Sequence, residues 1–137
     1  MKKIEVKNHI ESLKLVSKLK LGGTITKGLV KNALALEEEQ KYIDKFRVDL
    51  CERYCERDEE DEIIKQYEDD GSWNYTFTPE NNKLIEKEYL AFLDEDSKVE
   101  LIKNIQDALI DQFKDLTLEQ NFALKMFSPE TEEKKPD

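Results

Sequence analysis

Residue types that carry chemistry are scarce in this chain, which has one histidine and two cysteines among its 137 residues. A nucleophilic cysteine needs a base beside it, and His9 lies far along the sequence from Cys51 and Cys55. A structural zinc ion takes four ligands, which these three side chains cannot supply within one chain. We therefore expect reduced and neutral cysteines, no metal and no cofactor.

Glycine-rich phosphate loops and calcium loops are also missing. The four glycines match neither G-x-x-x-x-G-K-[ST] nor G-x-G-x-x-G. No acidic cluster has the spaced oxygen ligands and the later glutamate of a calcium loop. Because the chain has 32 acidic residues, carboxylates will meet by chance, and no pair of them identifies an acid–base catalyst. The sequence predicts a protein that is not an enzyme.

Long apolar runs are absent as well. No segment approaches the roughly 18 consecutive apolar residues of a membrane-spanning helix. The opening residues, MKKIEVKN, lack the apolar stretch of a signal peptide. We expect a cytoplasmic protein that has no membrane partner.

Charge is abundant, and the two signs are separated along the sequence. Residues 1–36 contain eight lysines and two glutamates, whereas residues 37–137 contain 14 basic and 30 acidic side chains. The net charge of −10 opposes binding to phosphate backbones, so we expect a protein partner and no direct contact with nucleic acid. Ends of opposite charge attract at low salt, which leaves a head-to-tail homo-oligomer open.

The first third of the chain predicts a short strand and a helix. Ile4 and Val6 alternate with charged residues, which is typical of a strand with one buried face. Asn8 then has the side chain of a helix N-cap, and the apolar spacing beyond it predicts a helix over 9–21. We expect this helix to end at Gly22, because glycine tolerates left-handed backbone.

A much longer helix is predicted over 25–56, with Thr24 as its cap. Polar Gln40 and Arg47 interrupt its apolar seam, which argues against a long dimeric coiled coil. The two-glycine joint is short, so we expect an antiparallel pair with the preceding helix. The seam repeats every seven residues, at Leu29, Leu36, Ile43 and Leu50.

A β-hairpin is predicted from segments 63–67 and 73–78, which flank an Asp-Gly turn. In the second segment Trp73, Tyr75 and Phe77 alternate with polar residues, so these aromatic rings share one face. No basic residue alternates with them, as one would in a nucleic-acid-binding sheet. We expect the rings to be buried against a helix.

The last third predicts three further helices. Thr78-Pro79 begins one that runs to about residue 94. Segment 97–102 is ambiguous, because its alternation suits a strand added to the hairpin whereas its capping-box spacing suits a helix; we favour the strand. The remaining two helices carry buried faces at Ile105, Leu109 and Phe113, and, after a capping box at Thr117 and Gln120, at Phe122, Met126 and Phe127.

Together these elements predict an α+β fold that is mostly helical. We expect a single domain over residues 1–128, in which a short N-terminal strand and an antiparallel helix pair precede a small hairpin-based sheet packed with the C-terminal helices. The polar segment 129–137 is predicted to be a disordered tail.

Two acidic clusters near the hairpin are the candidate partner-binding residues. The simplest interpretation is solvated charge, with the second cluster forming the Asp-Gly turn. The alternative is that the carboxylates imitate a row of phosphates and occupy a basic groove on a partner. The candidates are Asp58, Glu59, Glu60, Asp61, Glu62, Glu68, Asp69 and Asp70.

The order of these features resembles a known group of proteins. The stretch SKLKLGGTITKGLVKNALALEEEQKYIDKFRVDLCERYCERDEED, followed by an acid-and-glycine turn and by IEKEYLAFLDEDSKVEL, is similar to small uncharacterised proteins encoded by phages and prophages of Gram-positive bacteria. Genes of this group usually lie near tail and late structural genes. The resemblance, which covers about residues 4–127, implies a non-enzymatic protein that acts in the host cytoplasm during virion assembly. It supplies no catalytic residues, and the paired cysteines are not part of it.

Two functions follow from these expectations. The first is a virion assembly or accessory protein, above all of the phage tail, that works through protein contacts along the long helix and the hairpin. The second is an acidic anti-defence inhibitor that blocks the nucleic-acid channel of a basic nuclease. An enzyme that uses Cys51 or Cys55 is a third and weaker interpretation.

Overall fold

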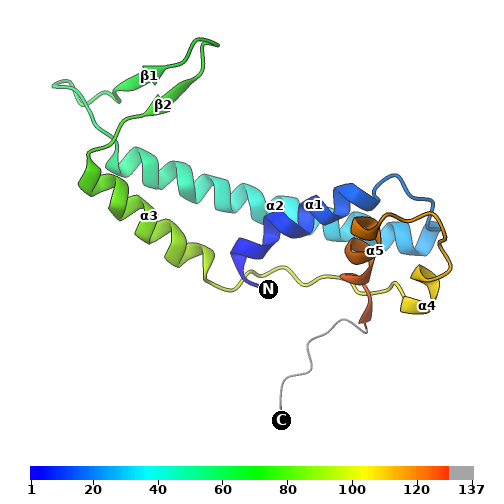
Figure 1. Cartoon of the computed structure of the whole chain (residues 1–137). Coiled ribbons are helices and arrows are strands. Elements are labelled where there is room, and N and C mark those ends of the chain that lie inside the picture. Colours follow the sequence, from blue (N-terminus) through cyan, green and yellow to red (C-terminus); the bar gives the residue numbers. More distant parts are fainter. Residues whose placement is uncertain (130–137) are drawn as a thin grey trace.

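The computed structural model describes residues 1–129 and confirms a mostly helical α+β fold with one small antiparallel sheet (Figure 1). The predicted tail, 129–137, lies outside the described residues except for Pro129. The elements, in chain order, are the 3₁₀ turn η1 (Lys3–Glu5), α1 (Val6–Val16), α2 (Gly23–Tyr54), β1 (Lys65–Tyr67), β2 (Trp73–Tyr75), α3 (Pro79–Leu93), α4 (Asp107–Ile110) and α5 (Leu118–Lys125).

Helix α2 is the long axis of the molecule. Its 32 residues, rich in the helix formers Ala, Leu, Glu and Lys, extend about 48 Å. The predicted seam faces the core, where Leu36, Ile43 and Leu50 are buried. The helix begins two residues earlier than predicted, after Gly22 at a φ of +89°, and Thr24 is not its cap. Gly22 therefore starts α2, where we expected it to end the preceding helix.

The predicted N-terminal strand is wrong, because residues 3–5 form a 3₁₀ turn that runs directly into α1. Asn8 lies inside α1 and not at its cap. Val6 lies seven residues before Leu13, so both side chains are on the same face of α1, and both are buried. Ile4, which a strand would have placed on the same face as Val6, is exposed. The chain leaves the helix at Val16, well before residue 21, because it must cross back to α2.

Helix α1 pairs antiparallel with α2, as predicted, and α5 packs against α1 as well (Figure 1). The capping box of α5 is also confirmed, since Thr117 Oγ1 accepts from Gln120 N and Gln120 Oε1 accepts from Thr117 N, both at 3.1 Å. Its buried face differs from the prediction: Phe122 is exposed, while Leu124 and Phe127 are fully buried.

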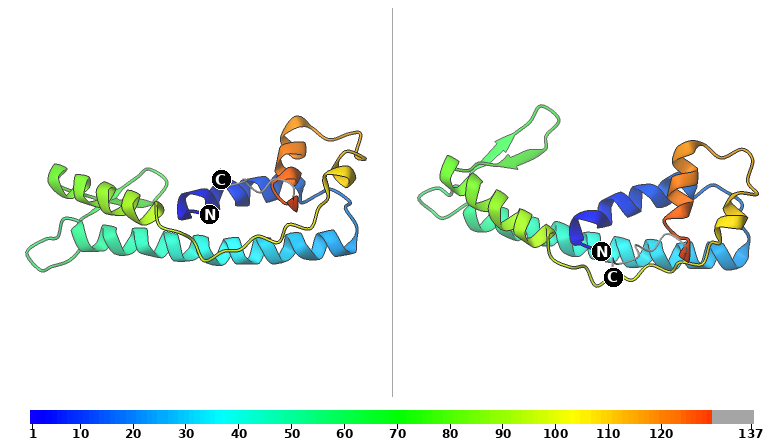
Figure 2. Two further views of the ribbon diagram at one scale, coloured as in Figure 1. Left: turned by 90° about the horizontal axis from the view of Figure 1, so that it is seen from below. Right: turned by 60° about the horizontal axis from the view of Figure 1, so that its bottom comes forward.

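The segment between α3 and α4 is an extended strap that runs along α2 (Figure 2). The prediction of a strand at 97–102 that joins the hairpin is therefore wrong. The strap is held by Asn32 of α2, whose Nδ2 donates to Ile102 O at 3.0 Å and whose Oδ1 accepts from Ile102 N at 2.7 Å. The amide of Asn32 thus makes the two backbone hydrogen bonds that a neighbouring strand would otherwise make with Ile102. Beyond the strap, the helix predicted around 105–113 shortens to α4.

Helix α3 starts as predicted, with Thr78 Oγ1 accepting from Asn81 N at 3.2 Å. It packs on the C-terminal half of α2, where the rings of Phe46 and Phe92 stack with centroids 3.8 Å apart. The buried Lys3 reaches this site from η1, with its ammonium 4.4 Å from the Phe92 centroid and 2.8 Å from a carboxylate oxygen of Glu95. The first residues of the chain therefore fasten the end of α3 to α2.

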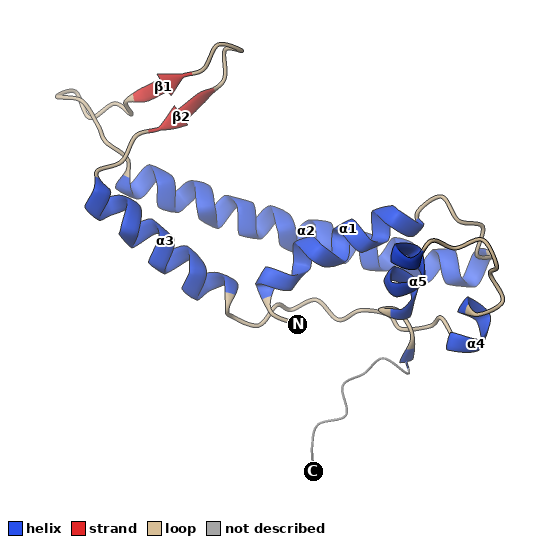
Figure 3. Cartoon of the chain, viewed as in Figure 1, coloured by secondary structure: helices blue, strands red, loops and turns tan. Residues whose placement is uncertain are grey.

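The hairpin is confirmed, with Lys65 opposite Tyr75 and Tyr67 opposite Trp73. Gly71, at a φ of +87°, makes the turn between the strands. The strands project from the end of the α2–α3 pair, at the opposite end of the molecule from α4 and α5 (Figure 3). The expected packing of the sheet with the C-terminal helices is therefore wrong, because the apolar residues of α4 and α5 join the core around α1.

Candidate protein-binding site

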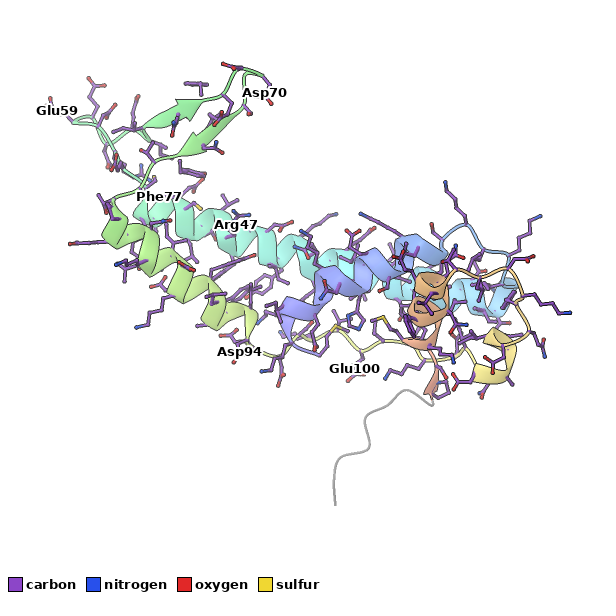
Figure 4. All side chains as sticks on the ribbon, in the orientation of Figure 1. Arg47, Glu59, Asp70, Phe77, Asp94 and Glu100 are labelled. Carbon is purple, nitrogen blue, oxygen red and sulfur yellow. The ribbon has the colours of Figure 1, made fainter. Side chains whose placement is uncertain are left out.

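All eight predicted acidic residues lie on one projection, residues 56–77, which we call the arm (Figure 4). Two backbone hydrogen bonds close the base of the arm: Glu56 N donates to Thr76 O at 2.8 Å, and Ile64 N donates to Glu56 O at 3.0 Å. The two ends of the arm therefore leave the helical body side by side.

The first acidic cluster is a loop before β1 that is shaped by two of its own members. Asp58 Oδ1 accepts from the backbone N of Glu60 and of Glu62, both at 2.9 Å, and Asp61 adopts a φ of +63°. Arg57 donates to Asp61 O at 3.0 Å. Asp58 and Asp61 thus build the loop, whereas no hydrogen bond of the loop uses the exposed carboxylates of Glu59, Glu60 and Glu62.

The second acidic cluster forms the turn of the hairpin. Asp70 Oδ1 accepts from both the backbone N and the Oγ of Ser72, and these bonds hold the pKa of Asp70 below its ordinary value. Glu68 accepts from Asn74 Nδ2 at 2.8 Å. Asp69 is exposed and completes the turn.

The two clusters lie at opposite ends of the arm, where Glu59 and Asp70 are labelled in Figure 4. The structure therefore brings the eight residues onto one projection but does not gather them into one patch or a regular row. The negative charge continues onto α3 and its C-terminal end, since residues 56–96 carry 15 acidic and four basic side chains, a net charge of −11.

Exposed apolar side chains lie between the acidic clusters, and the sequence analysis missed them. Tyr67 is 67% exposed and Ile64 is 39% exposed. All three residues of β1 are exposed, so nothing in residues 1–129 covers this strand. The available signal was the pattern of Ile63 to Tyr67, which has no clean alternation and hence no wholly apolar face to bury.

The aromatic residues of the arm pack mainly on one another. The rings of Trp73 and Tyr75 meet edge to face with centroids 4.8 Å apart, and the ammonium of Lys65 lies 4.8 Å from the Trp73 centroid. Tyr75 also lies beside the end of α2, where burial, and then the charge of Glu52, raise the pKa of its phenol. The rings of β2 are therefore half-buried, which leaves Tyr67, opposite Trp73 at the turn end of the hairpin, as the exposed aromatic side chain of the arm.

The cysteines and the histidine occupy different parts of the fold. Cys51 lies in the last turn of α2 and Cys55 caps it, while His9 lies on α1 with Nδ1 2.7 Å from Glu5 O. Burial raises the pKa of the Cys51 thiol, which disfavours the nucleophilic thiolate. Within residues 1–129, no three His, Cys, Asp or Glu side chains are grouped to hold a metal ion.

No protein-family model matches the chain, and no curated protein or solved structure is significantly similar to it. Among the helices of residues 1–129, none combines the length and the apolar character needed to cross a membrane.

Proposed function

We propose that this is a non-enzymatic phage or prophage protein that acts in the bacterial cytoplasm through protein–protein contacts, in virion assembly and above all in assembly of the tail. The arm is its contact surface. The resemblance of the sequence supports the phage setting, and the exposure of the arm supports the mode of action. The single observation that carries the proposal is an uncovered β-strand with an exposed tyrosine, held at the end of a long helical body.

The physical argument starts from the strand itself. A two-stranded sheet has free edges that can pair with a strand of another protein. Tyr67 adds a large amphipathic side chain of the kind enriched in binding hot spots. The α2–α3 pair holds the arm away from the rest of the molecule, so a large partner can reach it without colliding with the body.

The acidic clusters select the partner. Charges at the edge of a contact mainly accelerate association and disfavour wrong partners. The arm itself carries nine acidic and two basic side chains, a net charge of −7, so the favoured partner has a basic surface. The second cluster directly follows Tyr67 in the chain, and the first lies at the other end of the arm, so negative charge borders the apolar contact.

The test compares the intact protein with one whose arm is removed. Residues 58–74 are replaced by Gly-Asn-Gly, a change that the adjacent backbones of Glu56 and Thr76 allow. We expect the intact protein to bind a phage structural protein from infected cells, and Tyr67→Ser to weaken that binding about tenfold or more. Leu118→Ser, at an exposed position of α5, is the control and should bind normally. Equal binding by the armless protein would refute the proposal.

The second candidate function, an acidic inhibitor of a nuclease, is favoured by the concentration of negative charge around the arm. Changing Glu59, Glu60 and Glu62 together to Gln removes three charges and keeps Asp58 and Asp61, which shape the loop. An inhibitor would lose potency strongly in this variant, because charge would supply its affinity. The matched control changes the same number of charges at 37–39 on α2. Measured inhibition of a basic nuclease distinguishes the two functions, since an assembly protein would not inhibit it at all.

A further inference from the structure

The end of the molecule opposite the arm contains an apolar groove. A cavity of about 260 Å³ opens between α1, the 17–22 loop and the first turns of α2, with walls that include Leu13, Leu19, Leu29 and Val30. Val30 is 52% exposed, and Leu34 continues the apolar surface one turn further along α2. The cavity is smaller than the ~300–1,000 Å³ of a typical small-molecule site, so its size suits one or two protein side chains.

The segment that forms this groove is rich in lysine. Residues 10–37 contain five lysines and two glutamates, and Lys14 and Glu37 both lie in the wall of the cavity. Lys18 and Lys20 lie in the 17–22 loop that forms one side of the groove, and both are exposed. The groove therefore has an apolar floor within a segment that carries a net positive charge.

The arm has the opposite charge, and its exposed Tyr67 directly precedes the acidic turn at 68–70. The arm cannot reach the groove of its own chain, because α2 separates them with 32 residues, or about 48 Å of helix. Figures 1 and 4 show the arm at one end of the molecule and the start of α2 at the other. The arm can therefore reach only the groove of another copy.

We propose that the arm of one copy of this protein docks in the α1–α2 groove of a second copy, with Tyr67 in the apolar cavity and the acidic loops against the lysines. This inference rests on the proposed role of the arm as the contact surface. Each copy carries one arm and one groove at opposite ends, so the contact is head-to-tail and leaves a free arm and a free groove on every dimer. Further copies can therefore add in series.

The first experiment measures the mass of the purified full chain by sedimentation equilibrium over a concentration series. Between roughly 0.05 and 0.5 M NaCl the Debye length falls from about 14 to about 4 Å, which screens the contact between lysines and carboxylates. We expect the average mass to exceed that of a dimer at low salt and to fall towards the monomer at high salt. A monomer at every concentration in low salt would overturn the proposal.

Two substitutions at exposed positions test the two halves of the contact. Tyr67→Ser removes the side chain that enters the groove, and Val30→Asp puts a carboxylate on the rim. Each is expected to weaken association about tenfold or more. The matched control is Val48→Asp, which makes the same change 18 residues later on the same face of α2, at a position that is 45% exposed. Far-ultraviolet circular dichroism confirms that each variant keeps its helices.

Mixing the two variants distinguishes head-to-tail contact from every symmetric alternative. Tyr67→Ser keeps an intact groove and Val30→Asp keeps an intact arm, so an equimolar mixture should form dimers and nothing larger. An arm-to-arm or groove-to-groove contact would not be rescued by mixing, and the absence of mixed dimers would overturn the proposal. So would unchanged assembly of Val30→Asp, which would mean that something other than this chain fills the groove.

The outcome is separable from that of the proposed function. The sedimentation experiment contains no phage protein, whereas the capture experiment measures binding to one. Val30→Asp keeps its arm, so it should capture the phage structural protein normally while failing to form chains. Capture without self-association would overturn the inference alone, and self-association without capture would overturn the assembly function alone.

Discussion

At the scale of single residues, Asn32 joins the strap to the long helix. It is 1% exposed on the long helix, and its amide satisfies both the N–H and the C=O of Ile102. Buried backbone groups that lose such a partner destabilise the fold, because water cannot replace it. This side chain therefore fixes the middle of the strap to α2.

We expect Asn32→Ala to lower the free energy of unfolding by about 1–3 kcal/mol, because it leaves both backbone groups of Ile102 without this partner. Urea titration followed by circular dichroism measures the change. The control is Asn82→Ala on the exposed side of α3, for which the expected change is within about 0.5 kcal/mol. Similar losses of unfolding free energy from both substitutions would show that the Asn32–Ile102 hydrogen bonds have no special role.

The turn residue Asp70 gives a prediction about pH. Hydrogen bonds from Ser72 lower the pKa of Asp70 in the folded arm. They therefore stabilise the turn at pH values above the pKa of Asp70 in the unfolded chain, which is about 3.9. This contribution to stability is lost as the pH falls through the lower pKa that Asp70 has in the folded state. In an NMR titration of its carboxyl carbon, Asp70 should titrate below pH 3.9, and Ser72→Ala should move the midpoint upwards. Ser17→Ala is the control, and a wild-type midpoint at or above 3.9 would contradict the prediction.

At the scale of elements, the sequence predicted best those features that depend on residues close together in the chain. The caps at Thr78 and Thr117 are local hydrogen bonds, and the Asp-Gly turn between alternating residues is a local backbone requirement. Alternation over only three residues misled at Ile4 and Val6, because a helix buries Val6 equally well. The strap was missed because its partner is a side chain 70 residues away.

The candidate site was predictable in charge and not in shape. The acidic residues are evident from composition, but the length of the arm separates them into two groups. The exposure of Tyr67 depends on which helices fail to reach the hairpin, and this is decided by the packing of α4 and α5 elsewhere. The groove was missed for a related reason, since it exists only once α1 and α2 pair.

The arm should unfold before the helices. It is a hairpin of two three-residue strands, and such hairpins are marginally stable alone. Trp73 is the only tryptophan, so its fluorescence reports the arm while circular dichroism at 222 nm reports the helices. We expect the fluorescence transition at a lower urea concentration.

A variant whose single tryptophan lies between α2 and α3 provides the control for this experiment. In Trp73→Phe combined with Phe46→Trp, the only tryptophan lies in the ring stack between α2 and α3. Its fluorescence should follow the circular dichroism. Coincident transitions in the wild-type protein would show that arm and body unfold as one unit.

At the scale of the whole molecule, the fold is elongated. A compact chain of this length would have a radius of gyration of about 14 Å, yet α2 alone extends about 48 Å. Small-angle X-ray scattering at roughly 0.5 M NaCl, where association is screened, should give a radius clearly above 14 Å. The armless variant should have a shorter maximum dimension. A value near 14 Å for the intact chain would contradict the arrangement of the helices.

The packing of α5 on α1 has a consequence for biosynthesis. Gln120 of α5 donates to the backbone O of Leu15. One side of α1, which is synthesised early, is therefore covered only after α5 has been synthesised. The 101 residues between Val16 and Leu118 must be translated in the interval, which takes roughly 5–20 s at about 5–20 residues per second. Throughout that time one side of α1 is available to chaperones. A nascent chain released before residue 117 never covers that side, and we expect cellular proteases to degrade it.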